Sequence, residues 1–129
     1  MKRIILLAVT ILALNVNAQS KFRTTSVDTS AISVNLGNTT VTNVNVAYNG
    51  STTIWVKMYD SFTKPYAKNA VPVHTLQIPG NTVSNPYSLL DLKGLRFTKG
   101  LWIRCTTSIS DTSQKSGEPT TKPIVEIAY

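Results

Sequence analysis

Hydrophobic and polar residues alternate along much of the chain after residue 30, which is the pattern of β-strands with one buried face. In residues 31–36, for example, Ile32, Val34 and Leu36 share one face of a predicted strand. The same alternation predicts further strands over residues 44–48, 53–59, 73–78, 94–97, 100–106 and 124–129. No segment has the 3.6-residue period that predicts an amphipathic helix.

The pair Asn49-Gly50 lies between two of these alternating segments. Both residue types tolerate a positive φ, which the two-residue turns of β-hairpins require. We therefore predict a β-hairpin over residues 43–59. Residues 60–72 contain prolines and residues 108–122 are polar, so both are predicted to be surface loops.

Short strands separated by turns at this spacing are typical of a β-sandwich. We predict an all-β protein with a single β-sandwich domain over residues 31–129, preceded by a flexible or extended lead-in over residues 19–30. A jelly-roll and an immunoglobulin-like arrangement both fit this pattern. The Cys–Trp–Cys pattern of true immunoglobulin domains is absent, and the strand topology stays open.

Residues 1–18 have the pattern of a secretory signal peptide: a basic start at Lys2 and Arg3 precedes an apolar run over residues 4–14. Ala18 is the small residue after which we expect signal peptidase to cleave. The apolar run is shorter than the roughly 20 residues of a membrane-spanning helix, so we predict export by the Sec pathway without a stable membrane span. The periplasm, the cell surface, the extracellular medium and a virion all remain open as destinations.

Cleavage after Ala18 leaves 111 residues, which suffice for one domain with one core. Thr, Ser and Asn make up one third of them, and the net charge falls from +7 to +5. This modest positive charge is typical of a solvated surface, and with the export signal it predicts no nucleic-acid partner. Cys105 is the only cysteine, so no internal disulfide can form, and its place on the same strand face as Leu101 and Ile103 predicts a buried thiol.

The residue types that carry chemistry in enzymes and metal sites are scattered. His74 is the only histidine, no Gly-x-Ser-x-Gly motif accompanies it, and nothing in the spacing supports a dyad with Cys105. The acidic residues occur singly, as Asp28, Asp60, Asp91, Asp111, Glu118 and Glu126. We therefore predict no enzyme activity, no cofactor and no metal site.

Two predicted strands, 53–59 and 100–106, carry aliphatic side chains on one face and aromatic or basic side chains on the other. The second face holds Trp55, Lys57, Tyr59, Trp102 and Arg104. If the aliphatic faces form the core, this set lies outside, where tryptophan beside a cation is typical of an interface or a ligand contact. The alternative is that the loop 60–72 or 108–122 covers this face.

Three short motifs follow one another along the chain: Val-Lys-x-Tyr at residues 56–59, Pro-x-x-x-Leu-x-Ile-Pro at 72–79 and Gly-Leu-x-Phe-x-x-Gly-Leu at 94–101. With Asp111-Thr112 and the terminal aromatic residue, they resemble a group of small, mostly uncharacterised phage and prophage proteins over residues 43–129. The motifs consist of glycines, prolines and alternating apolar residues, so the resemblance concerns the fold. It implies a virion-associated or phage-encoded β domain without known catalysis.

These observations favour an exported, non-enzymatic β-sandwich that works by assembly or adhesion, as a homo-oligomer or with a virion protein. A small core without disulfides favours burial between chains, with Trp55, Trp102 and Arg104 at or near the contact. The alternative is a carbohydrate- or surface-recognition module that binds a surface glycan and uses Trp55 and Trp102 as stacking platforms.

We expect the amino terminus of the exported protein to be Gln19, free or cyclised to pyroglutamate, because the small residue Ala18 closes the signal pattern. Terminal mass analysis of exported material measures this directly. Exported protein that still carries Met1 would contradict the prediction and indicate a membrane-bound form.

Overall fold

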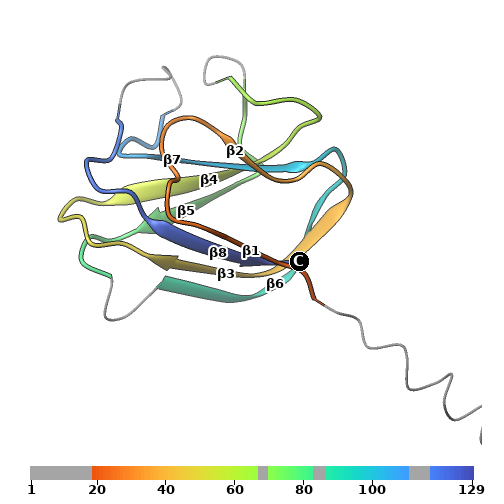
Figure 1. The fold of residues 1–129 in the computed structure, drawn as a ribbon, viewed down its shortest axis with the longest axis horizontal. Coiled ribbons are helices and arrows are strands. Elements are labelled where there is room, and N and C mark those ends of the chain that lie inside the picture. Colours follow the sequence, from red (N-terminus) through yellow and green to blue (C-terminus); the bar gives the residue numbers. More distant parts are fainter. Residues whose placement is uncertain (1–18, 67–69, 83–86, 111–116) are drawn as a thin grey trace, which may run out of the picture.

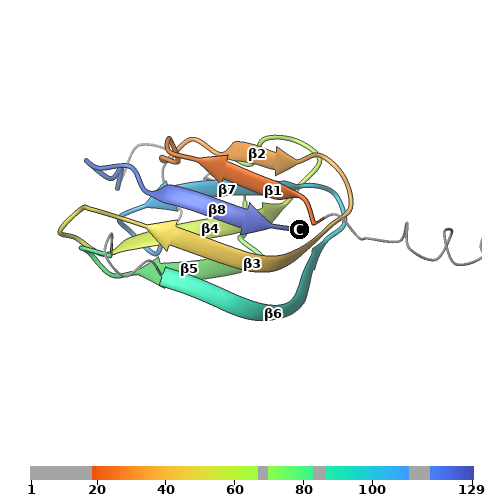
Figure 2. The ribbon, with the colours of Figure 1, turned by 60° about the horizontal axis from the view of Figure 1, so that its bottom comes forward.

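The computed structural model describes residues 19–66, 70–82, 87–110 and 117–129, with residues 87–93 described by their backbone alone. Over these residues the chain forms eight β-strands in two four-stranded antiparallel sheets and no helix. The sheets lie one against the other (Figure 1; Figure 2), which confirms the predicted all-β sandwich. The predicted signal peptide lies outside the described residues and stays a prediction.

Strand order defines the two sheets. The first sheet contains, side by side, β1 (Lys21–Thr24), β8 (Ile124–Ala128), β3 (Thr39–Ala47) and β6 (Tyr87–Phe97). The second sheet contains β2 (Ile32–Asn35), β7 (Leu101–Thr106), β4 (Ile54–Asp60) and β5 (His74–Ile78). Every strand predicted from the alternation is present, whereas β1 is a strand that the alternation does not predict.

The strand pairs are nested within one another along the chain. β1 pairs with β8, β2 with β7, β3 with β6 and β4 with β5, so the chain resembles one long hairpin folded over. Pairing of β3 with β8 and of β4 with β7 then joins these pairs into the two sheets. Only the β4–β5 connection stays within one sheet, and all others cross from sheet to sheet.

The predicted hairpin over residues 43–59 is wrong, because β3 and β4 belong to different sheets. Neither Asn49 nor Gly50 has a positive φ, so the two-residue hairpin turn does not form. Gly50 is needed for another reason: a Cβ there would overlap the Tyr48 hydroxyl. Its carbonyl also accepts a hydrogen bond of 2.9 Å from the Asn81 backbone N–H, which ties this crossover to the β5–β6 connection.

The lead-in expected over residues 19–30 instead contains β1, which pairs with the last strand. Ser20 and Tyr129 extend this pairing by exchanging two backbone hydrogen bonds of 2.8 and 2.9 Å. Val27, between β1 and β2, has no exposed surface and joins the core. Part of the flexible or extended lead-in is thus an extended strand, and its pairing was not predicted because the partner strand lies at the far end of the chain, where no local pattern reveals it.

One hydrophobic core fills the space between the sheets. The first sheet contributes Val41, Val44, Val46, Phe97, Val125 and Ile127. The second contributes Ile54, Val56, Met58, Leu76, Ile78, Leu101, Ile103 and Cys105. The aliphatic faces predicted for strands 53–59 and 100–106 are therefore buried, and each large side chain stabilises the fold by about 1.5–3 kcal/mol. Leu36 departs from its predicted face and is 67% exposed, because it lies beyond the end of β2.

The crossover from β6 to β7 is held by the carboxylate of Asp60, the last residue of β4. Asp60 accepts hydrogen bonds from the backbone N–H groups of Thr98, Lys99 and Gly100 (3.1, 2.6 and 3.2 Å) and from the Thr98 hydroxyl (2.9 Å). Gly100 has φ +150°, and a Cβ there would lie 2.9 Å from the Ser61 carbonyl oxygen. The connection from β6 to β7 is therefore held by the Asp60 carboxylate and by the close approach of the Gly100 backbone to the Ser61 carbonyl.

The hydrogen bonds around Asp60 also determine its acidity. Burial raises the pKa of the carboxyl group, but the bonds from Lys99, Thr98 and Gly100 outweigh burial and lower the pKa below its usual value. A lowered pKa in the folded state stabilises the fold above the unfolded pKa. That contribution disappears as the pH falls through the folded pKa.

We expect Asp60→Asn to lower the free energy of unfolding at pH 7 by about 1–3 kcal/mol. The charge-assisted hydrogen bonds to the carboxylate are replaced by weaker ones, and the new amide NH2 group faces backbone N–H donors with which it cannot bond. The deficit relative to the native chain should begin to shrink below about pH 4, where Asp60 becomes protonated in the unfolded chain, and should be lost as the pH falls through the lower pKa of the folded chain. Urea unfolding of both chains at pH 7 and below pH 4 measures this deficit. Glu118→Gln, the same change at an exposed acid, serves as the control. Equal urea midpoints for Asp60→Asn and the native chain at pH 7 would contradict this role.

Candidate functional site

The outer face of the second sheet brings together the five residues predicted from the sequence to contact a partner. In the register of β4 and β7, Lys57 lies opposite Arg104 and Tyr59 lies opposite Trp102. Trp55 lies one row further along β4, opposite Thr106. The predicted set therefore forms one cluster across two neighbouring strands.

Three members of this cluster are covered by the chain itself. The exposed fractions of Lys57, Tyr59 and Arg104 are 0, 1 and 1%, and each takes part in side-chain interactions there. This placement favours the covered-face alternative for these three residues. Trp55 and Trp102 stay half-buried on the same face.

The covering segment includes the connection between β4 and β5, here called the β4–β5 loop, of which the structure describes residues 61–66 and 70–73. The Trp102 indole N–H donates a hydrogen bond of 3.0 Å to the Ser61 carbonyl, which fixes the start of the loop against β7. Lys64, Pro65 and Tyr66 line a cavity of about 300 Å³ together with Arg104, and Lys64 reaches across to the Ser30 hydroxyl at 2.6 Å. This part of the loop therefore lies beside Arg104.

The described part of the β4–β5 loop exposes several large hydrophobic side chains. These are Phe62 (74%), Tyr66 (66%), Val71 (85%) and Val73 (50%), and the polar residues Thr63 and Lys64 are exposed beside them. Sequence reasoning places the contact on the sheet face beneath, because alternation describes strands and says nothing of which loop residues point outward. Of the six exposed large hydrophobic side chains among the described residues, four lie in this loop.

Cys105 and His74 do not form a catalytic pair. Cys105 has no exposed surface, and no hydrogen bond joins its thiol to His74 in the described part of the chain. Burial raises the pKa of the Cys105 thiol to about 12, despite a smaller opposing effect of Lys57. A thiol in this environment is a poor nucleophile at neutral pH.

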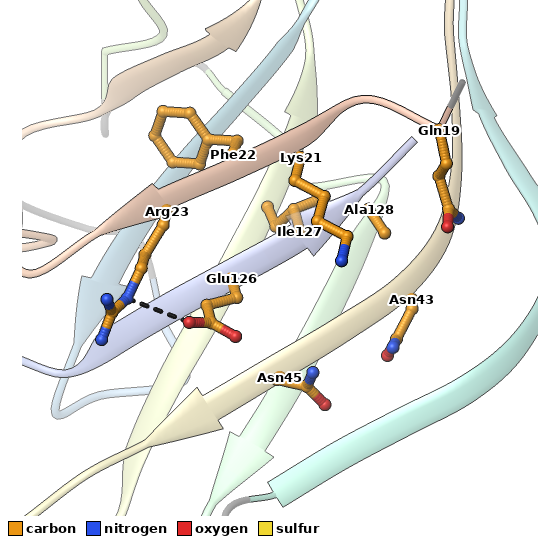
Figure 3. A pocket seen from close by; sticks show the side chains of 9 residues that line it. All are labelled: Gln19, Lys21, Phe22, Arg23, Asn43, Asn45, Glu126, Ile127 and Ala128. Carbon is orange, nitrogen blue, oxygen red and sulfur yellow. Dashed lines mark ion pairs between the residues drawn. The ribbon is translucent and has the colours of Figure 1, made fainter.

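The outer face of the first sheet carries a polar groove that the sequence did not indicate. Two cross-strand rows line it: Lys21, Ala128 and Asn43 in one, and Arg23, Glu126 and Asn45 in the other. The groove has a volume of about 450 Å³, and the side chains point into it from β1, β8 and β3 (Figure 3). The rows could not be read from the sequence because β1 itself was not predicted.

Hydrogen bonds and one ion pair shape the groove walls. Arg23 Nε lies 2.9 Å from Glu126 Oε1. The Gln19 carboxamide donates to the Thr42 hydroxyl at one end of the groove. Val41 and Val44 are buried while Thr42 and Asn43 between them are not, so a bulge in β3 turns two consecutive polar side chains outward.

Searches for similar proteins find no match to this chain among protein-family models, curated proteins or solved structures. Among the described residues, no helix is long and apolar enough to cross a membrane. The same residues contain no group of three His, Cys, Asp or Glu side chains placed to hold a metal ion.

We expect the Cys105 thiol to resist a disulfide reagent at pH 8 in the folded protein and to react fully in denaturant, because burial both blocks access and raises its pKa. Release of the coloured thiol product measures the rate. A Ser110→Cys variant, with a thiol at an exposed position, should react at once and shows that the reagent is active. Equally fast labelling of the native chain would contradict the assigned burial.

Proposed function

We propose that this chain is an exported, non-enzymatic β-sandwich, encoded by a phage or prophage, that works by assembly or adhesion at a virion or a cell surface. The signal pattern of residues 1–18 supports export, and the resemblance over residues 43–129 supports the phage association. The scattered acids and the buried Cys105 support a role in binding rather than catalysis.

We infer that the sandwich is a jelly roll rather than an immunoglobulin-like fold. Its nested strand pairs give the sheet orders β1-β8-β3-β6 and β2-β7-β4-β5, as expected when one long hairpin is rolled into two sheets. Jelly rolls form many viral capsid and lectin domains. This topology supports both an assembly role and a recognition role.

The exposed hydrophobic side chains of the β4–β5 loop are the observation that carries the assembly proposal. Phe62 and Val71 are 74% and 85% exposed, and four of the six exposed large hydrophobic side chains among the described residues lie in this loop. Such a concentration typically marks contact with another macromolecule. We assign it to a second copy of the chain, since a small disulfide-free domain gains from burial between copies. Trp55 and Trp102 extend the contact, whereas Arg104 supports it from beneath the loop.

Carbohydrate or surface recognition remains the second candidate function, and the groove on the first sheet favours it. Trp55 and Trp102 are half-buried, which limits their use as open stacking platforms. The groove instead presents carboxamides, a carboxylate and cations to solvent (Figure 3). These are the side chains that recognise hydroxyl-rich ligands by hydrogen bonds.

We expect the mature chain to be a homo-oligomer in light scattering, and Phe62→Ser to shift it toward monomer, because the exposed ring is lost from the contact. Ile109→Ser, which removes another exposed apolar side chain (71%) from the β7–β8 connection, is the matched control.

Fractionation of producing cells and released particles, followed by mass spectrometry, should find the chain in the exported or particle fraction. A native monomer at micromolar concentration would contradict assembly, and retention in the cytosol would contradict export.

A further inference from the structure

We propose that the groove on the first sheet binds an acidic saccharide, whose carboxylate lies against the Lys21 ammonium group. This inference rests on the proposed recognition role and names the ligand class for it. The groove joins the start and the end of the described chain, because its walls come from β1 and β8. It is separate from the aromatic and basic cluster on the second sheet.

A small side chain creates the hollow. Ala128 stands between Lys21 and Asn43 in its cross-strand row, while the neighbouring row has Glu126 at the same place on β8. The methyl group leaves a space above β8, with Lys21 on one side and Asn43 on the other (Figure 3). At about 450 Å³, the groove lies within the size range of small-ligand sites.

The charges in the groove favour an anionic group on the ligand. Glu126 is paired with Arg23 at 2.9 Å, so the carboxylate is already neutralised. Lys21 makes no ion pair with any described residue, although its side chain extends over the hollow (Figure 3). A ligand carboxylate placed there gains a charge-assisted hydrogen bond without displacing a protein partner.

The remaining side chains favour hydroxyl groups. Asn43, Asn45 and Gln19 each present a carboxamide, which offers two donors and one acceptor oxygen. The Asn43 Oδ1 atom is buried and accepts no hydrogen bond, so rotation of this half-buried amide toward a ligand hydroxyl would satisfy an acceptor that is otherwise left unmet. A sugar ring supplies several hydroxyl groups, each of which both donates and accepts hydrogen bonds as a carboxamide does.

A peptide strand fits this groove less well. β8 is paired on both sides, with β1 and with β3, so its backbone groups are used within the sheet. An extended peptide that lies over β8 cannot add main-chain hydrogen bonds to it, which is the usual source of affinity when a strand joins a sheet edge. Recognition in the groove therefore depends on side chains, and these match a saccharide.

The experiment uses the mature chain and calorimetric titration with oligogalacturonate and with a sialylated oligosaccharide, each beside its neutral methyl ester. We expect at least one acidic form to bind, and its ester to bind about tenfold or more weakly because the contact to Lys21 is lost. Lys21→Gln should weaken the acidic form by a similar factor and leave the ester unaffected. Ala128→Leu should abolish binding of both the acidic form and the ester, because the leucine side chain fills the hollow.

The matched control is Lys99→Gln, which removes the same charge from an exposed position outside the groove. It should bind as the native chain does, and equal weakening by Lys99→Gln and Lys21→Gln would overturn the proposal in favour of general charge attraction. Equal affinity for acid and ester, or no binding by either acidic saccharide, would also overturn it. Inorganic phosphate is an anion that has no sugar ring. If phosphate binds as tightly as the saccharide, the assignment of a sugar ligand is overturned. Loss of saccharide binding with particle association intact would leave the proposed function standing.

Discussion

Pairing of the first strand with the last is the interaction on which the rest of this structure depends. Lys21 and Ala128 lie opposite each other in the sheet although more than a hundred residues separate them in sequence. Without β1, the edge of the first sheet would move from β1 to β8, and the backbone groups on that side of β8 would lose their hydrogen-bond partners. No disulfide supports this closure, because Cys105 is the only cysteine. Long-range hydrogen bonds and core burial must therefore hold the two ends together, at the cost of slow, non-local folding.

The strands that could be predicted are those whose faces differ sharply. Val44 and Val46, or Ile54 and Val56, alternate with polar or bulky residues, and this local pattern is sufficient because one face packs on the core. The hairpin at Asn49-Gly50 fails for a physical reason: the glycine serves a close approach to Tyr48 instead of a turn with positive φ. A residue type limits what its backbone can do, but the neighbours brought by the fold decide which use is made of it.

The two outer faces show why candidate sites are harder to predict than strands. The cluster around Lys57 and Arg104 was found because its members alternate along two strands, but its burial depends on a loop whose path no local pattern determines. The groove was missed because its rows come from β1, β8 and β3, which are not adjacent in sequence. Its residues, such as Asn45 and Glu126, look like ordinary solvent-facing positions until the register aligns them.

Because the two surfaces lie on different faces of the sandwich, weak binding sites can be sufficient for the proposed adhesion. The β4–β5 loop lies on the second sheet and the groove on the first, so the two surfaces are on opposite sides of the sandwich (Figure 2). The proposed contact between copies through the loop would therefore leave each groove open. A shallow, solvent-screened site on one chain binds weakly, since surface charges contribute little in water. Several copies held in one oligomer raise the effective concentration of the remaining sites once one has bound, and avidity then exceeds the affinity of any single groove. In the proposed function, assembly through one sheet and recognition through the other are thus complementary parts of the same adhesive role.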